Sequence, residues 1–345
     1  MSSSIFSRSK NDRAIGSWLL WVAFLVFLMV MVGGATRLTE SGLSMVSWNP
    51  ILGIFPPFTQ ESWLAEFDAY KKFPEYLKVN AGMTLEEFKA IYWWEYSHRL
   101  LGRFIGLFFA IGLLVFLSKK MVRANLKPIL FFLFALGASQ GVLGWYMVQS
   151  GLVNEPDVSH YRLAAHLGLA LFIIISLVWV GLDLLRPSHR KKDKRLFRLA
   201  LLITFLIFLQ SIFGALVAGL NAGKIYNSWP DMNGSFLPEG PFSMEPWWLN
   251  LLENHGLVQF DHRILGYLIV FFSIYIFVFA KMNLASGPIR RATKTLMHST
   301  FLQMILGIST LLMGVPVWLG TIHQGMAVIL LVASLNLTHR TTGRY

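Results

Sequence analysis

Eight long apolar stretches constrain the fold of this chain more than any other feature of its sequence. A helix needs about 20 consecutive apolar residues to cross the hydrocarbon core of a bilayer. At that depth the backbone must satisfy its own hydrogen bonds, which leaves helices or closed barrels. The sequence therefore predicts an all-α polytopic membrane protein, with spans at about 16–36, 94–117, 128–148, 161–185, 197–220, 259–280, 292–314 and 317–338.

The composition supports a chain that is solvated by lipid. Charged residues make up 14% of it, compared with about 25% in soluble domains. There is no cysteine, which excludes disulfides, thiolate-bound zinc or iron–sulfur clusters, and covalent c-type haem. Any metal or cofactor has to be held by histidine, methionine, carboxylate or backbone groups.

The distribution of Lys and Arg predicts the orientation. The head, Met1–Arg13, is too short for a signal peptide and is expected to be a cytoplasmic tail. The inner segments then carry 20 of the 30 Lys and Arg residues, as the positive-inside rule requires; they are the head, 118–127, 186–198, 281–294 and the tail from 339. We expect a bacterial inner-membrane protein with both termini in the cytoplasm. The same rule explains the basic run His189–Arg195, so no nucleic-acid partner is needed.

Two outer segments, 37–92 and 221–258, are long and rich in aromatic residues and proline. Such segments suit packing at the membrane surface over a site. The first contains Thr84-Leu-Glu-Glu87, a capping-box pattern. It predicts a helix that begins near Thr84 and runs into the second span.

The two halves of the chain repeat the same motifs. The matched pairs lie 164, 157 and 163 residues apart; they are His98-Arg-Leu-Leu-Gly102 with His262-Arg-Ile-Leu-Gly266, His166-Leu-Gly168 with His323-Gln-Gly325, and Gln140-x-x-x-Gly144 with Gln303-x-x-x-Gly307. Ser47-Trp-Asn-Pro50 and Asn227-Ser-Trp-Pro230 follow the first and fifth spans. The sequence predicts two four-helix bundles, 1–190 and 191–345, related by a pseudo-two-fold axis along the membrane normal.

Four histidines fall near the outer ends of spans 2, 4, 6 and 8, at similar depth and two in each half. A single histidine in a membrane helix often serves only as an interhelical hydrogen bonder. Four at matched depth, repeated across a duplication, instead predict two bis-histidine haem sites, formed by His98 with His166 and by His262 with His323. Gly102 and Gly266 lie on the same helix faces and would leave room for a flat macrocycle. His160 lies on a different helix face from His166 and is expected at the rim.

Charged groups near these histidines differ between the halves. Glu95 precedes His98 by three residues, whereas span 6 has Gln259 at that place. The difference predicts that the first half performs chemistry and the second only holds a cofactor; the alternative is a glutamate favoured by the dipole at a helix start. Arg99, Arg162 and Arg263 could bind outward-facing haem propionates, or could simply extend to the membrane interface.

These motifs together resemble the haem A synthase family. The resemblance runs in order along nearly the whole chain, through Gly33-Gly-Ala-Thr-Arg-Leu38, Ser41-Gly-Leu-Ser-Met-Val-Ser-Trp-Asn-Pro50, Glu95-Tyr-Ser-His-Arg99, Tyr161-Arg-Leu-Ala-Ala-His-Leu-Gly168, Tyr226-Asn-Ser-Trp-Pro230, Asp261-His-Arg263 and Thr321-Ile-His-Gln324. The chain is most similar to the cysteine-free branch of alphaproteobacteria and mitochondria. His160 departs from the glutamine usual in this family, which puts no ligand in doubt.

The resemblance implies an enzyme that oxidises the C8 methyl of haem O to a formyl group, giving haem A for terminal oxidases. It implies that His262 and His323 ligate a haem b cofactor, while His98 and His166 hold the substrate haem. Glu95 would stabilise positive charge at the reacting carbon or move protons. A haem O-producing farnesyltransferase and an unidentified electron donor are the implied partners.

Two other classes share parts of this pattern. A membrane cytochrome with two b-type haems that takes electrons from quinol would use the same histidines, but would not need Glu95. A transporter or channel without cofactor would also account for parallel repeats.

Overall fold

The computed structural model describes residues 10–46, 52–152, 156–186 and 193–342. The Ser47-Trp-Asn-Pro50 motif and most of the predicted head therefore lie outside the described residues. Of the basic run His189–Arg195, only residues 193–195 are described.

Eight long helices occupy the predicted spans, which confirms the all-α membrane fold. They are α1 (Lys10–Leu38), α4 (Leu85–Ser118), α5 (Lys127–Gln149), α6 (His160–Leu185), α7 (Lys194–Gly219), α9 (His255–Met282), α10 (Gly287–Leu312) and α11 (Val317–Thr341). Each is long and apolar enough to cross a membrane. The described residues contain no β-strand.

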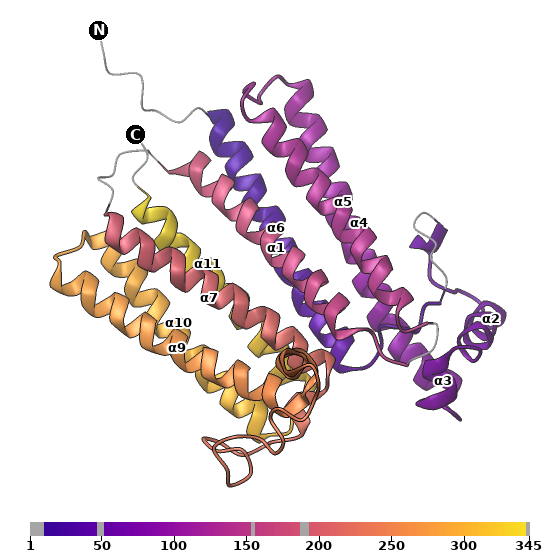
Figure 1. Cartoon of the computed structure of the whole chain (residues 1–345). Coiled ribbons are helices and arrows are strands. Elements are labelled where there is room, and N and C mark those ends of the chain that lie inside the picture. The colour runs from indigo at the N-terminus through magenta and orange to yellow at the C-terminus, as the bar shows by residue number, and fades with distance from the viewer. Residues whose placement is uncertain (1–9, 47–51, 153–155, 187–192, 343–345) are drawn as a thin grey trace.

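Each half of the chain closes a ring of four helices (Figure 1). In the first ring α1 packs on α4, α4 on α5, α5 on α6 and α6 on α1; in the second, α7, α9, α10 and α11 follow one another in the same order. Between the rings, α1 contacts α11, α6 contacts α7, and α6 contacts α11. These contacts would exchange places under the predicted pseudo-two-fold axis, which itself stays a prediction.

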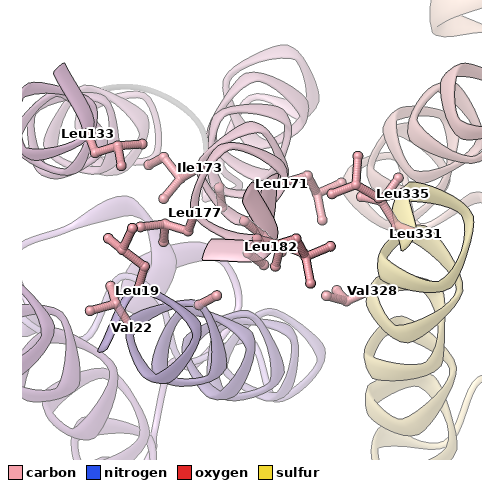
Figure 2. Packing of buried hydrophobic residues seen from close by; sticks show 14 of the residues in the cluster. Leu19, Val22, Leu133, Leu171, Ile173, Leu177, Leu182, Val328, Leu331 and Leu335 are labelled. Carbon is pink, nitrogen blue, oxygen red and sulfur yellow. The ribbon is translucent and has the colours of Figure 1, made fainter. Parts of the chain in front are cut away.

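A single apolar core runs through both rings, because the helices at their junction bury aliphatic side chains on two sides. Figure 2 shows Leu177 of α6 beside Leu19 of α1, and Leu171 of α6 beside Leu335 of α11. All four side chains are almost fully buried. Lipid supplies little hydrophobic force between helices, so close packing of this kind holds the rings together.

Glycines allow the closest approach between α1 and α6. A Cβ on Gly16 would lie 3.1 Å from the carbonyl oxygen of Gly181, and a Cβ on Gly181 would lie 3.3 Å from that of Gly16. Small residues at such crossings bring two backbones into contact and gain dispersion energy. The α1–α6 pair is therefore the most tightly constrained contact of the first ring.

The α1–α11 contact joins the two rings beside the predicted haem ligands. Gln324, the neighbour of His323, donates from its amide to the carbonyl of Val30 at 3.1 Å. A Cβ on Gly34 would collide with that same amide. Nearer the outer end, the Arg37 guanidinium donates to the carbonyls of Ala218 and Gly219 at 3.2 and 3.4 Å and so caps α7.

The two long outer segments lie at the end of the bundle opposite to the beginning of α1 and the end of α11 (Figure 1). Thr84 and Glu87 form the predicted capping box, and α4 extends ten residues before Glu95. Side chains of this part of α4 join residues of the first outer segment in a buried cluster that we call the aromatic cap. It consists of Met45, Trp63, Phe67, Tyr70, Phe88, Tyr92 and Tyr96. The cap includes α2 (Gln60–Tyr70) and lies near α3 (Pro74–Lys78), after a short turn η1 (Leu52–Ile54). The second segment forms only η2 (Ala222–Lys224), η3 (Trp247–Leu249) and α8 (Asn250–Glu253).

We expect Gly181→Ala to lower the melting temperature of the detergent-solubilised protein. The added Cβ would lie 2.9 Å from the Leu20 side chain, and overpacking of this kind costs about 1–3 kcal/mol. Gly106→Ala is the matched control, because a Cβ there meets no atom within 4 Å. Equal melting temperatures for the two variants in a fluorescence melt would show that the crossing is not tightly packed.

Candidate functional site

The structure brings the four predicted histidines together in two pairs. His98 on α4 and His166 on α6 stand at opposite corners of the first ring and are close enough to interact electrostatically. His262 on α9 and His323 on α11 occupy the same corners of the second ring and also interact. All four side chains are half-buried. Their role as iron ligands stays a prediction.

The imidazole of each histidine rests against a glycine on the preceding helix of the same half. A Cβ on that glycine would lie only 2.8–3.3 Å from a ring atom, closer than side chains normally pack. The glycines therefore fix where the imidazoles can lie; the contacts are Gly33 with His98, Gly144 with His166, Gly214 with His262, and Gly307 with His323.

Three of the four histidines are also braced by a glutamine one helical turn before the glycine. The glutamine amide donates to the backbone carbonyl of the histidine at 2.9–3.1 Å and lies 3.2–3.4 Å from a ring nitrogen; the pairs are Gln140 with His166, Gln210 with His262, and Gln303 with His323. We call each of the four glycines, together with the residue four positions before it, a cradle.

Sequence reasoning found only two of these cradles, as the repeated Gln140-x-x-x-Gly144 and Gln303-x-x-x-Gly307, and gave them no role. Gln210 and Gly214 have the same spacing on α7 and were missed, although the pattern is visible in the sequence. On α1 the equivalent of Gln210 is Met29, four residues before Gly33. The Met29 methyl and the Gln210 amide face Gly102 and Gly266, respectively, so these two predicted glycines border the cradles.

The residues present fit a haem. The imidazole Nδ1 atoms of His262 and His323 are buried without a hydrogen-bond partner, as nitrogens meant for another ligand would be. Among the described residues, no cluster of three or more His, Cys, Asp or Glu could enclose a bare metal ion. A porphyrin supplies four of the iron ligands itself, so the protein needs to provide only the axial ligands. Two imidazoles from opposite helices meet that requirement.

Glu95 is buried and fully bonded. Its Oε2 accepts from the Ser44 hydroxyl and from the Met45 backbone N–H, both at 2.7 Å. Its Oε1 pairs with Arg99 at 2.5 Å. Because α4 begins at Leu85, the alternative of a helix-start glutamate is wrong, since the dipole acts only within the first turn. The counterpart Gln259 instead donates to the carbonyl of Tyr226 at 3.0 Å.

The arginines that were predicted to bind propionates hold backbone carbonyls of the outer segments. Arg99 donates to Met45 at 2.8 Å, and Arg263 donates to Tyr226 at 2.9 Å and to Asp231 at 2.7 Å. Met45 and Tyr226 each lie twelve residues after a cradle glycine, so this contact repeats in both halves.

Arg162 has different partners. It donates to the carbonyl of Tyr146 at 2.7 Å, and its guanidinium lies 3.8 Å from the centroid of the Tyr146 ring. These contacts are more specific than extension to the membrane interface. The propionate role of all three arginines stays a prediction.

The other histidines that the structure describes lie apart from the two pairs. His160 begins α6 at the rim, where its Nε2 lies 3.4 Å from Glu253, a residue that also accepts from the Tyr161 hydroxyl. His298 is exposed, and His255 begins α9. His339, near the end of α11, has its Nε2 atom 2.9 Å from the Asp183 carboxylate.

Glu75 of α3 is a buried acid in the first outer segment. The residue is 5% exposed, and its Oε2 has no hydrogen-bond partner. Burial raises the pKa of Glu75 to about 8; a hydrogen bond with Tyr70 lowers it, and the charges of Glu95, Glu40 and Asp157 raise it further.

Comparison with known proteins gives one consistent family. The family model of the cytochrome oxidase assembly proteins COX15-CtaA matches residues 16–335. The chain is 48% identical to a haem A synthase of Parvibaculum lavamentivorans, covering 98% of this chain and 97% of the relative. It is 46% identical to one of Nitrosospira multiformis (95% and 93% covered) and 44% identical to one of Agrobacterium fabrum (100% and 95% covered).

We expect Gly214→Ala to weaken haem binding in the second half. The new Cβ would press on the His262 ring, and forcing a side chain off its rotamer costs about 1 kcal/mol, or roughly fivefold in affinity. Gly141→Ala on α5 is the control, since a Cβ there meets nothing within 4 Å. Haem content per protein and the low-spin absorbance of the purified variants measure the effect. Equal values for Gly214→Ala and Gly141→Ala would show that Gly214 does not position His262 for haem binding.

We expect the stability of the protein to fall as the pH rises from about 4.5 to about 8, in part because of Glu75. Its folded-state pKa is raised, so the folded protein holds this proton more tightly than the unfolded chain does, and the advantage is lost as the folded group ionises. Glu75→Gln should flatten this part of the curve of melting temperature against pH. Parallel curves for the two proteins would contradict a buried, protonated Glu75.

Proposed function

The chain belongs to the COX15-CtaA family of cytochrome oxidase assembly proteins, and on that premise we propose how its two cradled histidine pairs serve haem A synthesis. It is a multi-pass membrane oxidoreductase that converts haem O to haem A. The conversion of the C8 methyl to a formyl group removes electrons and protons from the substrate and adds one oxygen atom.

The second half holds the resident cofactor in this proposal. His262 and His323 are both seated on glycines and both braced by glutamines, so they suit a haem b that stays bound. A haem b held by these two residues would supply electron transfer. Gln259 stands where the first half has Glu95, so on α9 a neutral amide takes the place of that carboxylate.

The first half receives the substrate. His98 and His166 would ligate the iron of haem O and so fix the position of the ring in the membrane. The observation that carries the proposal is the repetition of the cradle in both halves, with a buried carboxylate in only one of them. The same protein framework then places one haem for electron transfer and another for reaction.

Glu95 supplies a fixed negative charge near His98. The proton-carrying alternative requires a side chain that can change partners, whereas both oxygens of Glu95 already accept hydrogen bonds from Ser44, Met45 and Arg99. A carboxylate held in one orientation can stabilise positive charge that develops on the substrate without reorganising during the reaction. Arg99, Arg162 and Arg263 complete the proposal as cations that receive propionates on the outer side.

The setting follows from the same proposal. The protein lies in the bacterial inner membrane with both termini in the cytoplasm, which the excess of Lys and Arg in the inner segments supports. Haem O would arrive from a farnesyltransferase, and an unidentified electron donor would supply electrons to the haem b. The dihaem quinol cytochrome is not supported by the relatives, which are named haem A synthases.

We expect Glu95→Gln to reduce haem A formation by about 100-fold, the lower end of what a positioned charged or proton-transferring group contributes. The test is co-expression with a haem O synthase in cells without haem A, followed by chromatography of the extracted haems. Haem b should remain at the wild-type ratio, because its site lies in the other half. Haem A at an undiminished rate would remove Glu95 from the reaction, and haem b alone in the wild-type protein would refute the proposed function.

A further inference from the structure

The cradle on α1 differs from the other three in one residue. Helices α5, α7 and α10 carry Gln140, Gln210 and Gln303 one turn before their glycines, whereas α1 carries Met29. The equivalence of Met29 and Gln210 is structural as well as sequential. The Met29 methyl would lie 3.2 Å from a Cβ on Gly102, and the Gln210 amide would lie 3.6 Å from a Cβ on Gly266.

The substitution removes a hydrogen bond that the other histidines have. Gln210 donates to the carbonyl of His262 at 2.9 Å and lies 3.2 Å from its Nε2. A thioether cannot donate a hydrogen bond. Within the described ranges, no side chain donates a hydrogen bond to His98, whose ring lies against Gly33. His98 is thus the one histidine of the four that is seated but not braced.

The unbraced histidine belongs to the half in which the proposed function places the substrate. A substrate haem must enter and its product must leave, so at least one axial bond has to break in every turnover. A resident cofactor has the opposite requirement. The glutamine hydrogen bonds differ between the halves in the same sense. Both histidines of the second half accept one, whereas in the first half only His166 does.

We propose that Met29 makes His98 the releasable ligand of the substrate haem, while Gln140 keeps His166 as the permanent one. Met29 is a positioning residue here, because it acts through His98. This inference rests on the proposed function and identifies which of the two ligands exchanges during turnover.

The experiment restores the missing brace. Met29→Gln should retain haem O or haem A in the first half, and should transfer it to an apomyoglobin acceptor about fivefold more slowly, the effect of one net hydrogen bond. The retained haem should show a larger low-spin fraction in its absorption and paramagnetic resonance spectra. The reciprocal Gln210→Met should release haem b about fivefold faster.

Met29→Leu separates the amide from packing, since leucine is of similar size but cannot donate. Equal retention by the glutamine and leucine variants, or release at the wild-type rate from Met29→Gln, would overturn the inference. Loss of haem from the first half of Met29→Gln would overturn it as well. The wild-type preparation tests the proposed function separately, because it must contain haem A whatever the variants do.

Discussion

The contact between each imidazole and a bare glycine backbone is the constraint on which the rest of this structure depends. An imidazole can approach a neighbouring helix so closely only where that helix carries no side chain, as Gly144 and Gly307 show. The order of helices around each ring then follows, because every cradle helix must stand beside the helix whose histidine it supports. Lipid outside the bundle provides little force to correct a misplaced helix, so these local contacts set the geometry of the site.

The sequence was sufficient for the fold and for the positions of the four histidines on alternate helices. Apolar length located all eight spans, and the capping box at Thr84 located the start of the longest helix. The duplication made His98 equivalent to His262 and His166 equivalent to His323, because motifs at a similar offset occupy equivalent places in a repeat. These predictions depend on periodicity and repetition, which are properties of the chain itself.

The partners of Glu95 could not be predicted in the same way. Ser44 and Met45 lie about fifty residues earlier, and nothing in their residue types marks them as donors to a buried carboxylate. The contacts of Arg99 with Glu95 and with the Met45 carbonyl were likewise not indicated by its place near the outer end of a span. The α7 cradle was within reach of sequence reasoning, since Gln210 and Gly214 repeat a spacing already noted elsewhere. Backbone contacts of loops depend on the folded path of the chain, whereas helix contacts follow from spacing.

Helix α1 uses two consecutive residues for two different purposes. Gly33 supports the imidazole of His98 in the first half. Gly34 makes room for Gln324, the neighbour of His323 in the second half. Neighbouring residues on a helix point about 100° apart, so α1 faces the histidine pairs of both halves. A small rotation of this one helix would displace Gly33 from His98 and Gly34 from Gln324 at the same time. The two halves therefore behave as one mechanical unit, and a shift of α1 that adjusts one histidine pair also disturbs the other.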